Sequence, residues 1–155
     1  MSRLTALQRG MITEFQGKYR FLSNFWPCQI VMRGQVFPSV ENAYQAAKTL
    51  DLEARQAFTC CASGAAKKLG RRLELRPDWD EVKEDLMLRM LRMKFRGELA
   101  ELLLGTADAH LQEGNRWGDR YWGVDLQTGV GENRLGSLLM TVRAELRQRT
   151  GQSRG

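Results

Sequence analysis

The chain is poor in the residues that hold metals and disulfides. Its 155 residues include one histidine, His110, and three cysteines, an odd number with no CxxC pair. We therefore expect neither a disulfide framework nor a structural zinc site, and free thiols are typical of a reducing compartment. No apolar run approaches the roughly 20 residues that span a bilayer, and the first ten residues lack the apolar centre of a signal peptide. These absences predict a cytoplasmic protein that needs no membrane, metal or cofactor.

Nothing in the sequence divides the chain into parts. With three prolines, no repeat and no Pro/Gly-rich linker, one domain over residues 12–148 is the economical interpretation, with loose termini at 1–11 and 149–155. Hydrophobic residues make up 43% of the chain and charged residues 27%, a balance typical of globular domains. The formal net charge of +6 favours anionic partners such as phosphorylated metabolites or nucleic acid. Part of this excess lies in Arg143–Arg154. We interpret this segment as a frayed, solvated end in preference to a nucleic-acid-binding arm.

Turn and cap signals predict a mostly helical α+β fold with a small β-hairpin near the N-terminus. In Gln29–Phe37, two short apolar runs flank Gly34, a residue suited to a hairpin turn. Ser39, Asp51, Ser63 and Asn133 are candidate helix caps, and Asp78 with Glu81 forms a capping-box-like start. Helices are expected over residues 39–50, 51–60, 63–70, 78–95, 98–104 and 133–148.

The first of these helices carries three polar residues on one face. Glu41, Gln45 and Lys48 stand at i, i+4 and i+7. Spacing alone favours a solvated polar face. The alternative is functional: Glu41 lies in the first turn, where the positive end of the helix dipole favours an ionised carboxylate. Such a group suits a base, a nucleophile or a stabiliser of cationic charge.

An aromatic segment, Arg116–Asp125, has two interpretations as well. Its two tryptophans and one tyrosine fit a lid that seals the core. They also fit a ring-stacking pocket in which Asp119 is a second carboxylate and glycines Gly118 and Gly123 let the backbone approach a ligand closely. Spacing does not choose between them.

The glycine-rich segment Gly129–Gly136 precedes the last helix. A simple turn followed by a cap explains it. Free backbone N–H groups at the helix start, with Arg134 beside them, would instead form a phosphate cradle. The segment is not a P-loop, because the glycine spacing and the Lys-Ser/Thr pair are missing.

Together these stretches resemble the YbiA/NADAR family of N-glycosidase-like proteins. Their order and separation carry the resemblance over roughly Phe15–Leu146. The matching pieces are FLSNF from Phe21, SVENAYQAAK from Ser39, DWDEVKEDLM from Asp78, KF at Lys94, LLLGT from Leu102, DRYWG from Asp119 and GENRLGSLLMTVR from Gly131. The chain departs from the family pattern at Asp125, where some members have a glycine. This difference affects how the loop that contains Asp125 would approach the substrate.

The resemblance implies a compact, mostly helical fold and metal-independent cleavage of an N-glycosidic bond at a ribose C1′. The leading substrate hypothesis is a phosphorylated ribosylamino-pyrimidine, an intermediate of riboflavin synthesis. The alternative is removal of ADP-ribose from guanine, in nucleic acid or in the free nucleotide. A non-enzymatic nucleotide- or nucleic-acid-binding module, with structural carboxylates, is a further possibility. The oligomeric state is not predicted.

The resemblance also assigns residues to the site. Glu41 matches the motif glutamate taken as catalytic, and an ionised carboxylate beside C1′ stabilises oxocarbenium charge. The role of Lys48 is left open: it could pair with Glu41, bind phosphate or act as a nucleophilic amine. The full prediction is catalytic Glu41 and Asp119, with substrate-binding Asn24, Lys48, Trp79, Trp122, Asn133 and Arg134.

Overall fold

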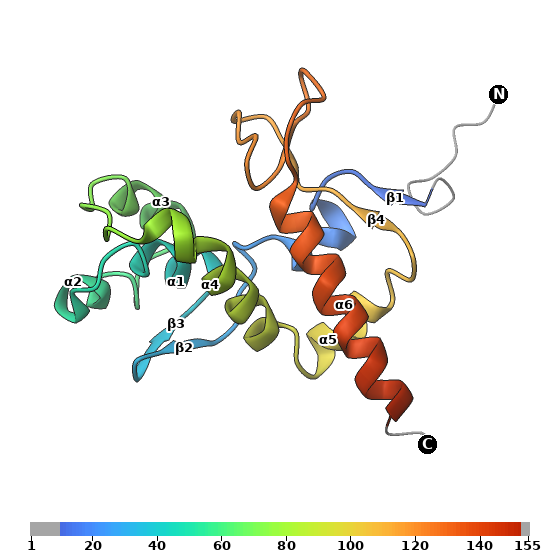
Figure 1. Ribbon diagram of the computed structural model, residues 1–155, viewed down its shortest axis with the longest axis horizontal. Coiled ribbons are helices and arrows are strands. Elements are labelled where there is room, and N and C mark those ends of the chain that lie inside the picture. The colour runs from blue at the N-terminus through green and yellow to red at the C-terminus, as the bar shows by residue number, and fades with distance from the viewer. Residues whose placement is uncertain (1–9, 153–155) are drawn as a thin grey trace. The chain divides into compact units, whose positions relative to one another are not determined.

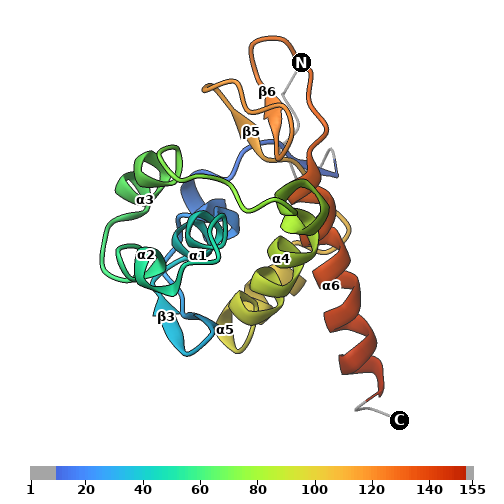
Figure 2. The same ribbon diagram turned by 60° about the vertical axis from the view of Figure 1, so that its left-hand side comes forward.

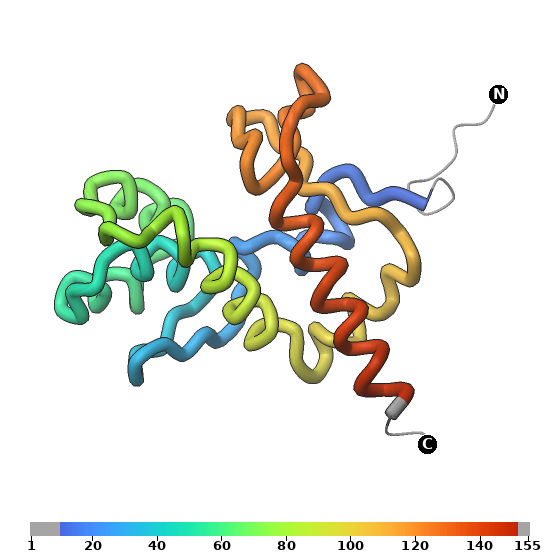
Figure 3. Tube along the Cα trace, viewed as in Figure 1, coloured from blue at the N-terminus to red at the C-terminus, as the bar shows by residue number. Residues whose placement is uncertain are grey.

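The computed structural model describes residues 10–152. The chain divides into two compact units. A central unit comprises Asn24–Lys94, and a terminal unit comprises the described residues 10–23 and 95–152. The Cα trace enters the central unit once and leaves it once (Figure 3). The expected loose segments therefore lie largely outside the description, at 1–9 and 153–155.

The central unit combines a β-hairpin with four helices (Figure 1). Strands β2 and β3 pair antiparallel, with Ile30 opposite Phe37, and Gly34 occupies the turn at φ +77°. This confirms the predicted hairpin. Helix α1 packs against α3, α4 and both strands. The elements are β2 (Ile30–Met32), β3 (Gln35–Phe37), α1 (Val40–Ala46), α2 (Leu52–Gln56), α3 (Ser63–Gly70) and α4 (Trp79–Lys94).

Helix α1 forms the buried centre of this unit. All seven of its residues are buried. Its alanines Ala43 and Ala46, and Ala47 just after its end, are fully inaccessible, and their small side chains allow neighbouring helices to approach closely. Ser39 caps the helix as predicted, since its side chain accepts a hydrogen bond from the backbone N–H of Asn42 at 3.1 Å. The helix ends four residues before the predicted Leu50.

The terminal unit is built around the long helix α6. Its apolar residues Leu135, Leu139 and Val142 recur at i, i+4 and i+7 and are buried. Strand β1 pairs in parallel with β4, and β5 with β6. Figure 2 shows β5 and β6 beyond the N-terminal end of α6. The elements are β1 (Met11–Ile12), the 3₁₀ helix η1 (Gly17–Leu22), α5 (Glu98–Leu104), β4 (His110–Leu111), β5 (Gly114–Asn115), β6 (Val124–Asp125) and α6 (Arg134–Gln152).

The arginine-rich end of α6 differs from the prediction. The helix continues to Gln152, and Arg143 is only 5% exposed, with Nη1 donating to Thr106 Oγ1 at 2.8 Å. Arg147 pairs with Asp108 at 3.0 Å. The interpretation of a frayed, solvated end is therefore wrong for Arg143 and for the backbone as far as Gln152, although residues 147–151 are exposed. Arg154 lies outside the described residues. Arg143 and Arg147 anchor the last helix to the segment that follows α5.

The predicted fold class is confirmed as α+β and mostly helical. Strands β4, β5 and β6 and the 3₁₀ helix were not predicted, because two-residue strands have no period to recognise. Within residues 10–152, no helix combines the length and the apolar character needed to cross a bilayer.

Candidate active site

The predicted site residues fall into two groups of four. One group belongs to the central unit and the other to the terminal unit. Within each unit, hydrogen bonds and ring contacts link the members to one another or to shared neighbours. The central group is Asn24, Glu41, Lys48 and Trp79; the terminal group is Asp119, Trp122, Asn133 and Arg134.

The polar face of α1 is buried. Glu41 is 8% exposed and Gln45 is 5% exposed, so the interpretation as a solvated face is wrong for both residues. Gln45 Nε2 donates to Glu41 Oε1 at 2.8 Å, which fixes one carboxylate oxygen. Gln45 Oε1 lies where a Cβ on Gly70 would be, 1.8 Å from that position. A glycine in α3 thus makes room for the side chain that orients Glu41.

A residue that the sequence prediction left out anchors the start of α1. Asn42 is fully buried. Its Nδ2 donates to the carbonyls of Phe58 and Cys61 at 2.9 and 2.8 Å, and its Oδ1 accepts from Ser39 and Ser63 at 2.7 and 3.1 Å. This network joins the first turn of α1 to the start of α3. Glu41 therefore stands on a rigid element.

Asn24 lies against the first turn of α1. Its carbonyl oxygen accepts from the backbone N–H of Glu41 at 3.0 Å. The side-chain Nδ2 is 3.7 Å from Met87 Sδ. Among the described residues, nothing hydrogen-bonds the buried Asn24 Oδ1. Buried carbonyl oxygens nearly always have a donor, so this atom is a candidate acceptor for a ligand group.

Lys48 is half-buried at the far end of the same face. Burial lowers the pKa of its amine; the charge of Glu41 raises it, and the charges of Arg71 and Lys67 lower it further. The ammonium nitrogen is 5.7 Å from the centroid of the Tyr44 ring. The net effect is a pKa below the ordinary value of 10.5, which increases the fraction of neutral amine.

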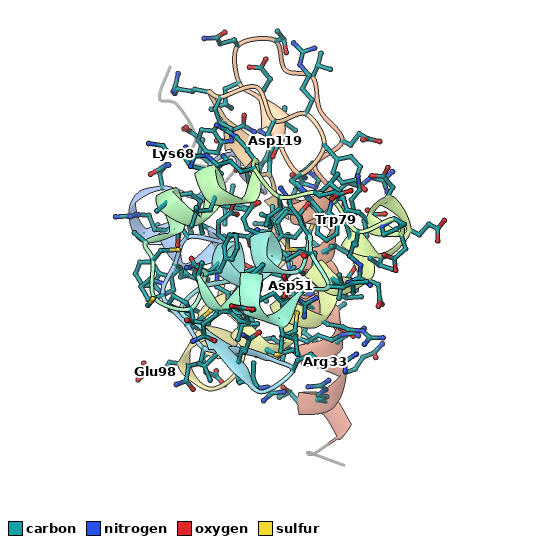
Figure 4. The ribbon with its side chains drawn as sticks, turned by 90° about the vertical axis from the view of Figure 1, so that its left-hand side faces the viewer. Arg33, Asp51, Lys68, Trp79, Glu98 and Asp119 are labelled. Carbon is teal, nitrogen blue, oxygen red and sulfur yellow. The ribbon has the colours of Figure 1, made fainter. Side chains whose placement is uncertain are left out.

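Trp79 packs against the same side of the unit. It is 6% exposed, and its ring lies 5.1 Å from that of Tyr44 at an interplanar angle of 54°. Figure 4 labels it at the start of α4. Tyr44 thus joins Trp79 to Lys48. The structure brings Glu41, Lys48 and Trp79 around one buried helix face.

In the terminal unit, Asp119 organises a loop. Its Oδ1 accepts from the backbone N–H groups of Tyr121 and Trp122 at 3.0 and 2.9 Å. The amide of Asn115 holds its backbone in turn, through Oδ1 to Asp119 N and Nδ2 to Asp119 O, both at 2.9 Å. An Asp that bonds backbone two residues on is a common turn device. This bonding orients Trp122 and uses only Oδ1 of Asp119, so Oδ2 takes no part in it.

The start of α6 does not offer a backbone phosphate cradle. Its first N–H groups and those just before it already have partners. Those of Glu132, Asn133, Arg134 and Leu135 donate to the carbonyls of Arg120, Gly123, Tyr121 and Trp122, at 2.8, 3.2, 3.1 and 3.0 Å. The hypothesis of free N–H groups at this helix start is therefore wrong. The loop that contains Trp122 covers them.

Asn133 joins this helix start to the β4–β5 segment. It is 8% exposed with φ +52°. Its Oδ1 accepts from Glu113 N at 3.0 Å, and its Nδ2 donates to Leu111 O at 2.9 Å. Both ends of the amide are therefore used inside the protein. The observed role of Asn133 is to hold the helix start against the β4–β5 segment. Its assignment to substrate binding remains a prediction.

Arg134 and Trp122 present side chains on the same loop and helix start. Arg134 has a side chain 45% exposed, lies 3.3 Å from Glu132 Oε1 and stands 5.8 Å from the Tyr121 ring. Trp122 is half-buried and meets Tyr121 edge-on at 5.0 Å. An exposed guanidinium beside aromatic rings suits an anionic ligand.

Gly123 permits a close approach, but to protein. A Cβ there would lie 1.8 Å from Glu113 Oε2 and 2.2 Å from Glu113 O. Asp125, at the position where some relatives have glycine, is buried; its Oδ1 accepts from Gln127 N at 3.0 Å and its Oδ2 lies 3.4 Å from Arg120. The aromatic segment is thus held by its own loop bonds.

A family model described as the NADAR domain matches residues 12–147. The chain belongs to the NADAR family. It is similar to N-glycosidase YbiA of Escherichia coli (strain K12), with 41% identity over 133 residues that cover 83% of this chain and 82% of that protein. A riboflavin biosynthesis protein of Vibrio vulnificus (strain YJ016) is 38% identical over 133 residues, 83% of this chain and 36% of that longer protein.

A solved structure supports the same assignment. The NMR structure of the Escherichia coli protein YbiA matches this NADAR-family chain with a TM-score of 0.79 at 37% identity, covering 91% of this chain and 88% of that one. The family resemblance drawn from the motifs is confirmed. The fold is that of a solved NADAR-family relative.

Proposed function

We propose that the protein is an N-glycosidase that hydrolyses the C1′–N bond of a phosphorylated ribosylamino-pyrimidine. The observation that carries this proposal is the buried, hydrogen-bonded Glu41 on α1. Names of NADAR relatives support the reaction class, and that of the Vibrio vulnificus relative supports the link to riboflavin synthesis. The substrate and the site residues are carried over from the family resemblance and weighed against the chemistry of each residue.

Glu41 meets the main demand of this reaction. Breaking a ribosyl C1′–N bond develops positive charge on the sugar, and a preorganised carboxylate stabilises that charge. Gln45 donates to one of its oxygens and so keeps the group oriented before substrate arrives. Little reorganisation is then needed in the transition state. In the hydrolytic step the same carboxylate accepts a proton from the attacking water.

The remaining contacts are assigned to other predicted site residues. The buried Asn24 Oδ1, next to the first turn of α1, is assigned to a ribose hydroxyl, which would donate the hydrogen bond that this atom lacks. Trp79 and Trp122 are assigned to the leaving base. The exposed Arg134 is assigned to phosphate. Asp119 is assigned to water or leaving base through Oδ2, because Oδ1 is held by the loop.

Of the three roles left open for Lys48, we assign it that of a nucleophilic amine. Desolvation and two neighbouring cations lower its pKa, a combination that prepares lysines for nucleophilic attack. In this scheme the neutral amine forms a bond to C1′ while the C1′–N bond to the base breaks and the base takes up a proton. The sugar ring opens to an imine, and water then releases the sugar and restores the amine.

The substrate class is tested with a pair of compounds. The protein is incubated with the phosphorylated ribosylamino-pyrimidine and, separately, with an oligonucleotide that carries ADP-ribose on guanine. We expect release of the pyrimidine, undiminished by a metal chelator. Release of ADP-ribose from the oligonucleotide, with no cleavage of the pyrimidine compound, would favour the second candidate, which the net charge of +6 supports. Salt-sensitive binding without cleavage of either compound would indicate a binding module.

A further inference from the structure

The central unit contains a cavity lined by residues of β2, the β2–β3 turn, α2, α4 and the loops before α2 and α4. Its volume is about 540 Å³, within the range of about 300–1,000 Å³ typical of small-molecule sites. None of the eight predicted site residues lines it. Figure 4 shows Arg33, at the hairpin turn, well apart from Trp79. Four arginines line the cavity: Arg33, Arg55, Arg76 and Arg89.

The positive charge of this cavity is only partly compensated. Arg76 forms a two-point pair with Asp78 at 2.6 and 3.0 Å, and Arg89 pairs with Asp85 at 3.0 Å. Four arginines less two aspartates leave a local charge of +2. Within residues 10–152, neither of the other two arginines has a carboxylate partner.

Arg55 is the most unusual member of the group. It is only 4% exposed, and its side chain makes one hydrogen bond within the described chain, from Nε to the carbonyl of Thr49 at 2.8 Å. Burial lowers its pKa, and the charges of Arg76 and Arg33 lower it further. An anion between such guanidinium groups would offset their mutual repulsion. The hydrogen bond from Nε fixes one edge of the Arg55 guanidinium.

The rest of the cavity wall is apolar. It is formed by Met32, Leu50, Leu52 and Leu86. Leu50 is 60% exposed and Leu52 is 49% exposed, which is a large apolar area for two residues so close in sequence. Apolar walls with a few fixed polar groups are the usual make-up of a small-molecule site. An extended nucleic-acid surface would instead need a basic stripe with aromatic rings.

We propose that this cavity binds a small phosphorylated ligand with a ring, such as a nucleoside monophosphate. The phosphate lies among Arg33, Arg55 and Arg76, where guanidinium forks match its oxygens. The ring lies against Leu50 and Leu52. None of the eight predicted site residues lines this cavity, although the backbone of Arg76 is hydrogen-bonded to Lys48 and Trp79. Occupancy of the cavity is measured by binding rather than by base release.

The test uses the full-length protein with AMP as the probe. The ¹³C-methyl NMR signals of Met32, Leu50 and Leu52 report on the cavity, and that of Met140, in the terminal unit, serves as reference. We expect AMP to shift the cavity signals saturably. Adenosine lacks the phosphate and inorganic phosphate lacks the ring, so each should bind at least about tenfold more weakly.

Variants make the test specific. Arg33→Gln, at an exposed turn, should weaken AMP binding about tenfold through loss of one charged contact. Arg72→Gln, an exposed arginine of the same unit outside the cavity, should leave affinity within about twofold. Arg55→Gln is a second test, with a thermal melt to check folding.

Three results would overturn the proposal. The first is no saturable shift of the cavity methyls with AMP. The second is unchanged AMP affinity in both Arg33→Gln and a folded Arg55→Gln. The third is a single-stranded oligonucleotide that binds the cavity more tightly than AMP, which would assign it to nucleic acid.

Discussion

Replacement of Lys94 by methionine tests the energetics of the central unit. Lys94, the last residue of α4, is 2% exposed. Burial lowers the pKa of its amine from the ordinary 10.5 to about 7, although the nearby Cys28 acts in the opposite direction. Lys94→Met keeps the length of the side chain and removes the titrating group.

The sign of the pH effect follows from linkage. Between about pH 7 and about pH 10.5 the unfolded chain binds a proton on Lys94 that the folded protein has released, so stability rises with pH. The full difference of 3.5 pKa units, 10.5 less 7, corresponds to about 5 kcal/mol. Between about pH 7 and about pH 9 the lysine contributes a rise of about 2 kcal/mol. The penalty of burying the amine is fully present only below about pH 7.

Urea denaturation at several pH values provides the measurement. The free energy of unfolding of the wild type minus that of Lys94→Met should rise by about 2 kcal/mol from about pH 7 to about pH 9. Lys68→Met, at an exposed lysine of α3, should give a flat difference. Any hydrogen bond lost with the amine changes the stability difference by a constant amount and leaves its change with pH unaltered. A difference for Lys94→Met that is flat within about 0.5 kcal/mol would refute the reasoning.

Three further predictions concern the site and the thiols. Gly70→Ala places a Cβ 1.8 Å from Gln45 Oε1, so it should displace Gln45 and reduce kcat, whereas Gly64→Ala, which meets nothing within 4 Å in the same helix, should leave kcat unchanged; equal kcat in both variants would argue against Gln45 as the orienting group. Borohydride added during turnover should leave a sugar adduct on Lys48, detected by peptide mass spectrometry and absent in Lys48→Arg; no adduct in the wild type would return Lys48 to a charge-pairing role. Iodoacetamide should modify the exposed Cys60 first, because burial raises the pKa of the thiols of Cys28 and Cys61; mass spectrometry that finds Cys28 modified first would contradict its burial.

Local signals predicted the elements that hold the central group of site residues. Ser39 caps α1 and Asp51 caps α2 through side-chain hydrogen bonds to the backbone two or three residues away. Such local bonds can be predicted from the residue type at the start of a helix. Ser63 was expected to cap α3 but is its first residue, with Ala62 in the cap position. Burial of Glu41 was not predictable, because the spacing of a polar face does not reveal what packs on it. Here the covering element is α3, which reaches Gln45 through Gly70.

Long-range bonds account for the errors in the terminal unit. Asn133 precedes a helix as predicted, yet its amide bonds Glu113 and Leu111, about twenty residues earlier. The N–H groups of the helix start were expected to be free because the carbonyls of the loop at Tyr121 could not be placed from sequence. Asp119 did carry a local signal, since an aspartate before a tight turn commonly accepts backbone bonds. The cavity lined by arginines draws on four separate segments of the chain and leaves no contiguous motif.

The central claim is that Glu41 stabilises charge at C1′, and Glu41→Gln tests it most directly. Glutamine keeps the shape and can still accept the bond from Gln45 Nε2, so the fold and the binding of ribose 5-phosphate should persist. Base release from the phosphorylated ribosylamino-pyrimidine is measured in a single turnover. We predict a loss of at least about 100-fold, the scale of removing one preorganised electrostatic group. Release at the wild-type rate by a folded, ligand-binding Glu41→Gln protein would contradict the account.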